Sequence, residues 1–214
     1  MNIIAKVKIA LKKSLIKRIK NIETLDDMKK LLKFAQSQSK FKPGKKIEVD
    51  NKMQTGYSYT LQEPVGKNFD PEFKPDLTPK QMLDMGVFEG KYCNDCVLEY
   101  PREWFKDAIK KGKLSPEKAN SDINEFNIKS RQSLKIWKKK GWIFGPDPRG
   151  WFEWYMRYYL GRRIPDVDKK QIKRWKAFKR HEAQVIKNCR PNDKKCRPKQ
   201  RQALAQWAYN PNVG

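Results

Sequence analysis

Residues 76–210 carry a series of helix start and stop signals, and this feature limits most strongly the folds open to the chain. Pro, or a Ser, Thr or Asp that can cap a helix, marks the start of each of seven short predicted helices, and Gly ends most of them. The starts are Thr78-Pro79, Pro101, Ser115-Pro116, Ser130, Asp147-Pro148, Pro165-Asp166 and Pro198, and the stops are Gly86, Gly112, Gly141 and Gly161. The sequence therefore predicts an all-α fold, a compact domain of about seven short helices over residues 77–210.

Residues 1–36 predict a basic, helical N-terminal arm. Apolar residues recur at helical spacing over residues 3–20, lysines fill the remaining positions, and Thr24 begins a second helix over about 24–36. Four interpretations of residues 3–20 stay open: an arm on nucleic acid, a peripheral membrane helix, a mitochondrial presequence, or a helix packed on the body with a solvated lysine face.

Residues 37–76 predict a linker or extended segment. They carry Ser, Gln, Lys, Gly and four Pro with weak periodicity. Tyr57, Tyr59 and Leu61 alternate with polar residues and predict a short strand.

The charge of the chain predicts a polyanionic partner. The 214 residues carry a net charge of +25, and residues 169–201 hold 14 basic side chains against two acidic ones. Acids that would neutralise such a segment are nearly absent, so we expect contact with the phosphates of nucleic acid, with DNA favoured over RNA. The candidate contacts in this part of the chain are Arg162, Arg163, Lys169, Lys170, Lys173, Arg174, Lys176, Arg180, Arg197 and Arg201.

Residues 120–143 resemble a helix-turn-helix. A first helix is predicted over about 120–126, and a second from Ser130 to Lys140 would present Arg131, Lys135 and Lys138 to the partner. Two short helices and a turn occur in many α-domains, so the pattern has low specificity.

The aromatic segment 151–160 predicts a buried central helix. Arg149, Glu153 and Arg157 recur at intervals of four and should form one exposed polar stripe on it. The alternative is that some of its rings, among Trp151, Trp154, Tyr158 and Tyr159, stack on bases.

The four cysteines stand as Cys93-x2-Cys96 and Cys189-x6-Cys196, and they allow a four-thiolate zinc site. Zinc ribbons have two x2 pairs, so the match is partial, and reduced thiols without a metal or other cofactor are favoured. The small number of cysteines and the lack of a visible signal peptide or of 18 consecutive apolar residues predict an intracellular protein, in cytoplasm or nucleus, or one packaged in a virion, not a secreted one.

Two other functions remain as alternatives to simple nucleic-acid binding. Gly145-Pro146-Asp147 resembles the loop with a catalytic Asp in DNA glycosylases, which would make the chain a DNA-modifying or repair enzyme. Asp147 before Pro148 is more simply explained as a helix cap, so a non-enzymatic protein is favoured. A structural protein of a virion or organelle is the second alternative.

Several motifs resemble a family of small, basic, functionally uncharacterised proteins of bacteria, fungi and large DNA viruses. The matching stretches are residues 77–92, 133–143, 147–152, 157–159, 161–163, 174–176, 196–204 and 207–209. The resemblance implies one contiguous domain over about 57–210 and leaves the lysine-rich first 50 residues as an extra arm. It implies no mechanism. Family members tend to have Met where this chain has Cys93, which argues further against zinc.

Overall fold

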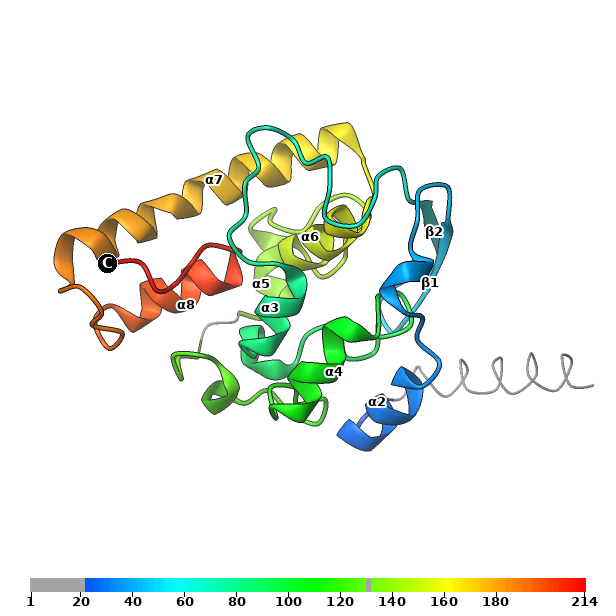
Figure 1. The fold of residues 1–214 in the computed structure, drawn as a ribbon, viewed down its shortest axis with the longest axis horizontal. Helices are drawn as coiled ribbons and strands as arrows, with labels where there is room; N and C mark the ends of the chain where they lie inside the picture. Colours follow the sequence, from blue (N-terminus) through cyan, green and yellow to red (C-terminus); the bar gives the residue numbers. More distant parts are fainter. Residues whose placement is uncertain (1–21, 130–131) are drawn as a thin grey trace, which may run out of the picture.

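The computed structural model describes residues 22–129 and 132–214 as a mostly helical protein with one small sheet (Figure 1). The predicted helical class is confirmed at this level, and the two-stranded sheet is the departure from it. The α-helices are α2 (Leu25–Leu32), α3 (Pro79–Asp84), α4 (Glu103–Lys110), α5 (Leu134–Lys139), α6 (Trp151–Leu160), α7 (Pro165–Asn188) and α8 (Pro198–Gln206). Short 3₁₀ turns are η1 (Gln38–Lys40), η2 (Val87–Gly90) and η3 (Ser121–Ile123). The predicted helix at 3–20 lies outside the described residues.

Helix α6 forms the centre of the core, as its aromatic sequence predicts. Nine of its ten residues are buried. It lies in the middle of the molecule, with α7 on one side of it and α3 and α4 on the other (Figure 1). Phe73, which precedes α3, packs its ring edge-on against Trp154 and Tyr155 of α6 and Trp175 of α7. Edge-to-face contacts of this kind are favourable beyond the area they bury, so α6 and α7 are held together through one loop residue.

Helices α7 and α8 form a helical hairpin (Figure 1). Pro165 occupies the first turn of α7 and Pro198 that of α8, positions where the missing N–H of proline costs nothing. The helix start predicted at Pro165-Asp166 is therefore confirmed for α7. Within the described ranges, no helix has the length and apolar character needed to cross a membrane.

The segment 37–76, expected as a linker, contributes to the same core as the helices. Strands β1 (Lys46–Asp50) and β2 (Thr55–Thr60) form an antiparallel hairpin whose register pairs Lys46 with Thr60. Ile47 and Val49 point inward and alternate with exposed residues. The strand predicted at Tyr57–Leu61 is thus confirmed, whereas its partner was not expected because charged residues flank its apolar positions.

Gly161 joins this segment to the end of α6. Its φ is +117°, and a Cβ at this position would lie 2.0 Å from the carbonyl oxygen of Glu63. The carbonyl of Gly161 accepts hydrogen bonds from the backbone N–H groups of Gln62 and Glu63, at 2.8 and 3.1 Å. Only glycine permits both the left-handed backbone and this approach.

Three of the predicted helix starts are wrong. After Ser115-Pro116 the chain forms turns, because the N–H groups of Ser115 and Asn120 donate to carbonyls of η2 and so tie both ends of the segment down. Helix α5 begins after Ser133 and not after Ser130, since the Ser133 hydroxyl accepts from the Ile136 N–H. Helix α6 begins at Trp151, because the Asp147 side chain binds two arginines instead of capping a helix.

Candidate nucleic-acid interface

One face of α7 carries a row of exposed cations. Their spacings of three, four and seven residues place them on the same side of a helix of 3.6 residues per turn. They are Lys169, Lys173, Lys176, Arg180 and Lys187, all exposed. A different side of α7 is buried through Ile172, Trp175 and Val185. The row, called here the α7 basic face, extends over about 27 Å at 1.5 Å per residue.

The α7 basic face is nearly free of compensating acids. Lys176 pairs with Glu72 at 2.7 Å, and both side chains are well exposed. Among the described residues, no carboxylate lies within ion-pair distance of the other four cations. Exposed pairs such as Lys176–Glu72 contribute little to stability, so a phosphate could replace Glu72 at low cost.

Other predicted contacts are also exposed. Lys135 and Lys138 lie on α5, Lys170 is on α7, and Arg197 precedes α8. The predicted helix-turn-helix, which would have presented Lys135 and Lys138, is absent from the described residues. Its expected first helix is only the three-residue turn η3. The side chain of Asn124 ends it, because its amide donates to the Ile128 carbonyl and its oxygen accepts from the Glu89 N–H. Arg131 lies outside the described residues.

Two predicted contacts, Arg162 and Arg201, are wrong, because both guanidinium groups are buried inside the protein. Arg162 is 2% exposed and binds both carboxylate oxygens of Asp147, at 2.8 and 2.7 Å. Arg201 is 1% exposed and donates to backbone carbonyls only. Arg163 is partly exposed, but it donates to carbonyls at Tyr158 and Lys67, among others, and is committed to the fold. Burial keeps the first two guanidinium groups away from a phosphate, and the terminal nitrogens of Arg163 are taken up by backbone carbonyls.

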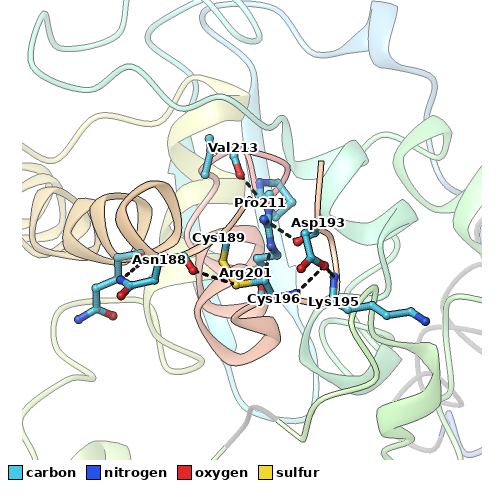
Figure 2. Close-up of a disulfide and its surroundings, with 9 residues drawn as sticks. Asn188, Cys189, Asp193, Lys195, Cys196, Arg201, Pro211 and Val213 are labelled. Atoms are coloured by element: carbon cyan, nitrogen blue, oxygen red, sulfur yellow. Dashed lines mark hydrogen bonds between the residues drawn. A yellow bond between two sulfur atoms is a disulfide. The ribbon is translucent and has the colours of Figure 1, made fainter. Parts of the chain in front are cut away.

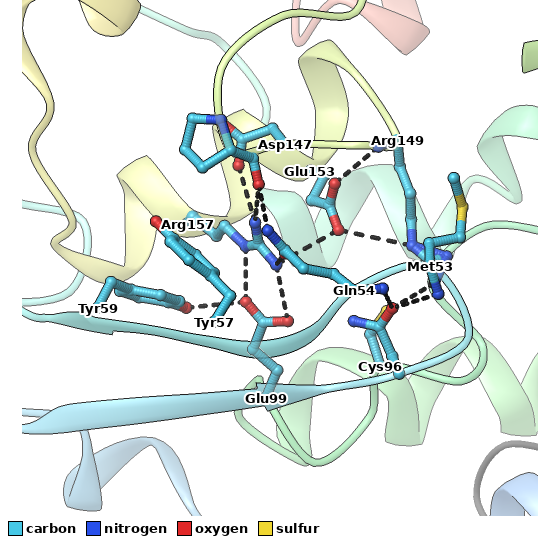
Figure 3. Close-up of polar contacts among 12 residues, drawn as sticks. Met53, Gln54, Tyr57, Tyr59, Cys96, Glu99, Asp147, Arg149, Glu153 and Arg157 are labelled. Carbon is cyan, nitrogen blue, oxygen red and sulfur yellow. Dashed lines mark hydrogen bonds and ion pairs between the residues drawn. The ribbon is translucent and has the colours of Figure 1, made fainter.

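The polar stripe of α6 is buried rather than exposed (Figure 3). Arg157 donates to Glu99 at 2.7 Å and to Asp147 at 3.0 Å, and also to Gln54 of the β1–β2 turn at 2.8 Å. Arg149 pairs with Asp95 at 2.8 Å. The spacing of Glu153 and Arg157 on α6 was predicted correctly, whereas Arg149 lies just before the helix. The acceptors of the two arginines come from distant parts of the chain, and they bury these side chains in an internal network.

Asp147 is therefore a structural residue of this network, not the catalytic residue that its loop suggested. Its side chain is fully buried, and both oxygens are bonded by Arg162 while one also accepts from Arg157. A general base needs access to substrate and an acceptor lone pair that is not already shared between two cations. The glycosylase-like alternative loses its candidate residue.

Glu153 gives the network a pH dependence. Burial, with Glu99 nearby, raises the pKa of Glu153 to about 7, although Arg157 and Arg149 oppose this. The folded protein thus holds this proton up to about pH 7, whereas the unfolded chain releases it near the ordinary value of 4.5. The wild-type protein should therefore lose stability through Glu153 as the pH rises across this window.

The substitution Glu153→Gln should remove this loss, because an amide does not titrate and its oxygen can still accept from the Arg149 N–H. From pH 5 to pH 8 the variant should gain about 2.5 kcal/mol in free energy of unfolding relative to wild type. Urea unfolding of both proteins at the two pH values measures this. A difference between them that does not change with pH would contradict the assignment.

The cysteines do not form a four-thiolate zinc site. Cys189 and Cys196 are joined in a disulfide that closes the turn between α7 and α8 (Figure 2). Cys93 and Cys96 are buried free thiols, and burial raises the pKa of both. Among the described residues, no group of three or more His, Cys, Asp or Glu side chains is placed to hold a metal ion. The sequence separation of seven and the Pro191-Asn192-Asp193 turn were the available signal for the disulfide.

An aromatic pocket of about 230 Å³, missed by the sequence analysis, lies among α5, α6, α7 and α8. Its aromatic walls include Trp137, Trp142, Trp151, Phe178 and Trp207. The rings of Phe178 and Trp207 stack with centroids 3.8 Å apart, and Trp151 lies 4.6 Å from Trp207. Trp142 is 41% exposed and is the most exposed of the five. The available signal was a tryptophan directly after the Lys138–Gly141 turn, where no core periodicity requires one.

Arg174 lines this pocket and is the candidate contact that the structure places best. It donates to the Trp142 carbonyl at 2.6 Å and to Gln171 at 3.1 Å, and its guanidinium lies over the Trp207 ring at 5.4 Å. Burial lowers its pKa to about 10, so it remains charged at neutral pH. Within the described chain it has no carboxylate partner.

A larger hollow of about 790 Å³ lies beside the buried network, between α5 and the Cys93–Asp95 turn. Two of the cations around it are already engaged: Arg149 with Asp95 at 2.8 Å, and Lys91 with the Glu117 carbonyl at 2.8 Å. It is lined by acids as well as bases, so its charges do not select a polyanion.

Comparison with known proteins identifies no relative of this chain. The chain matches no protein-family model, and searches of curated proteins and of solved structures return no significant match. The resemblance to a family of small basic proteins stays a prediction, and the functional argument depends on the arrangement of side chains described above.

Proposed function

We propose that this protein binds nucleic acid, mainly through the phosphate backbone, with the α7 basic face as the principal contact surface. The observation that carries the proposal is the row of exposed cations with only one acidic partner among the described residues. Cations at this spacing repel one another unless counterions or phosphates lie over them, and release of counterions from nucleic acid on binding favours the complex.

The neighbouring cations extend this surface. Lys170 and Arg174 continue it around α7 toward α5, where Lys135 and Lys138 are exposed. Lysine contacts at phosphates carry no sequence information, so we expect binding that is strong at low salt and weakly selective for sequence. DNA is favoured as the partner over RNA, as proposed from the sequence.

The test removes three cations of the α7 basic face together, as Lys169→Gln, Lys173→Gln and Arg180→Gln. If each contacts one phosphate, the slope of log K against log salt should fall by about two to three, and affinity near 0.1 M salt by about 10- to 100-fold. Fluorescence anisotropy with single-stranded and duplex DNA of equal length, at several salt concentrations, measures both quantities.

A matched control removes the same charge elsewhere. Lys33, Lys106 and Lys110 are exposed on or next to α2 and α4, on the other side of α6 from α7 (Figure 1). Their replacement by Gln should leave the salt slope within about one unit of wild type. Equal losses in the two triple variants would mean that net charge alone, and not the α7 basic face, determines binding. A wild-type affinity that does not change with salt concentration would reject phosphate binding.

A further inference from the structure

We propose that the aromatic pocket holds one unstacked base of a single-stranded nucleic acid, with Arg174 positioned for the adjoining phosphate. The inference depends on the proposed function and extends it from the backbone to the base. It names a second site, on the flank of α7 between the α7 basic face and α8.

The dimensions and walls of the pocket suit a single planar ring system. A volume of about 230 Å³ is below the roughly 300–1,000 Å³ of sites for drug-sized ligands. Trp142 is available at the surface for stacking, while Trp207 is fixed inside by Phe178 and Trp151. Every base has a π-face, so aromatic walls bind bases with little dependence on sequence.

A buried hydrogen-bond donor also indicates a polar ligand. Trp151 lines the pocket, and its indole Nε1 is buried and has no acceptor within the described part of the chain. A buried N–H without a partner is costly, so such groups usually have an acceptor in the functional state. Ring nitrogens and carbonyl oxygens of bases are acceptors, whereas a purely hydrocarbon ligand would leave this N–H unpaired.

The charges at the aromatic pocket favour a ligand that is an anion as well as aromatic. None of the described residues that line it is acidic, and Arg174 lines it as a cation. Lys140 lies 4.7 Å over the Trp142 ring, and Lys170 and Arg174 lie over Phe144 at 5.9 and 5.7 Å. A nucleotide within a strand offers both parts, a ring for the pocket and phosphates for these cations.

The strand must be single, or locally opened, for its base to enter. A base in a duplex is paired and stacked, and taking it out costs free energy that a single strand does not pay. The site should therefore make the protein prefer single strands over duplex, although the α7 basic face alone would not.

The experiment compares a single DNA strand of about 12 nucleotides with a strand of the same length whose central sugars carry no base. Wild-type protein should bind the normal strand roughly 5- to 100-fold more tightly, the range expected for stacking one base. Trp142→Ala should abolish this ratio and leave affinity for the baseless strand unchanged, because the Trp142 carbonyl that Arg174 binds remains. Phe34→Ala is the matched control and should retain the ratio, because Phe34 is an exposed aromatic residue, 47% accessible, that does not line the pocket.

Each result decides between the proposals. Equal binding of the normal and baseless strands by wild type would overturn the base pocket while leaving phosphate binding intact. Binding of neither strand would reject the proposed function itself. A free mononucleotide that competes as well as the strand would overturn the assignment to single strands. An acidic peptide with aromatic side chains that displaces the strand, at lower concentration than the strand itself, would assign the pocket to a protein partner instead.

Discussion

The substitution Asp147→Ala should lower the free energy of unfolding by about 3–5 kcal/mol, the cost of breaking a buried ion pair by removing one partner. The Asp147 carboxylate is the shared acceptor of Arg157 and Arg162, and all three side chains are at most 2% exposed. Without it, two guanidinium groups stay buried with one anion fewer. Glu99 still serves Arg157, but the described residues offer Arg162 no other carboxylate within ion-pair distance.

Urea unfolding and thermal melting test this expectation. For a domain of this size the loss corresponds to a fall in Tm of roughly 6–20 °C. The matched control is Glu48→Ala, which removes an acid from the exposed pair with Lys46 and should cost less than about 1 kcal/mol. An Asp147→Ala protein as stable as the control variant would show that the network does not hold the fold together, and would reopen a chemical role for this carboxylate.

The same network shows what could and could not be predicted from the sequence. The spacing of Glu153 and Arg157 correctly predicted two polar residues on one side of α6, whereas Arg149 lies just before that helix. Whether that stripe meets water or protein depends on Asp95 and Glu99, more than 50 residues away in sequence. Local periodicity carries no information about such partners, so a charged stripe was assigned to the surface by default.

Helix ends were predictable where a single local signal determines them. Thr78 and Gln81 form a reciprocal capping box, and Pro165 and Pro198 stand in the first turns of α7 and α8. Prediction failed where the capping residue had a stronger partner elsewhere. Asp147 is the clearest case, since its pairing with Arg162 outweighs the capping of a helix at Pro148.

The candidate interface was predicted in part for a similar reason. The exposed cations of α7 follow from helical periodicity, because the apolar positions of that helix define its buried side. Arg162 and Arg163 look equivalent in sequence, yet one is buried on a carboxylate and the other is bonded to carbonyls. The aromatic pocket assembles residues from four helices and the segments next to them, which a one-dimensional pattern does not bring together.

Substitution of Arg201 should have the second large effect on stability, because hydrogen bonds from its guanidinium hold the C-terminal residues in place. It donates to the carbonyls of Cys196 at 2.9 Å and Asp193 at 3.1 Å in the disulfide turn, and to Pro211 at 2.6 Å and Val213 at 3.0 Å in the tail (Figure 2). One side chain thereby ties the α7–α8 turn to the last residues. The disulfide closes only the turn and does not reach the tail.

Arg201→Met keeps the aliphatic bulk of the side chain and removes these hydrogen bonds. It should lower the free energy of unfolding by about 2–5 kcal/mol, since each buried carbonyl left without a donor costs about 1–3 kcal/mol and some of the four can reach water. The Asn192 N–H, which donates to the Gly214 carbonyl at 3.0 Å, should exchange with solvent faster as the tail detaches. Lys199→Met, exposed on the same helix, should change stability by less than about 0.5 kcal/mol.

The two roles considered for Arg201 give opposite results in this experiment. A structural Arg201 loses stability on substitution, while the folded fraction binds single-stranded DNA with the salt slope of wild type. A phosphate contact would instead leave stability unchanged and lower the slope by about one. Because a folded domain can hide a cation as easily as it presents one, stability and salt dependence must be measured on the same variant to separate the cations that build this protein from those that bind its partner.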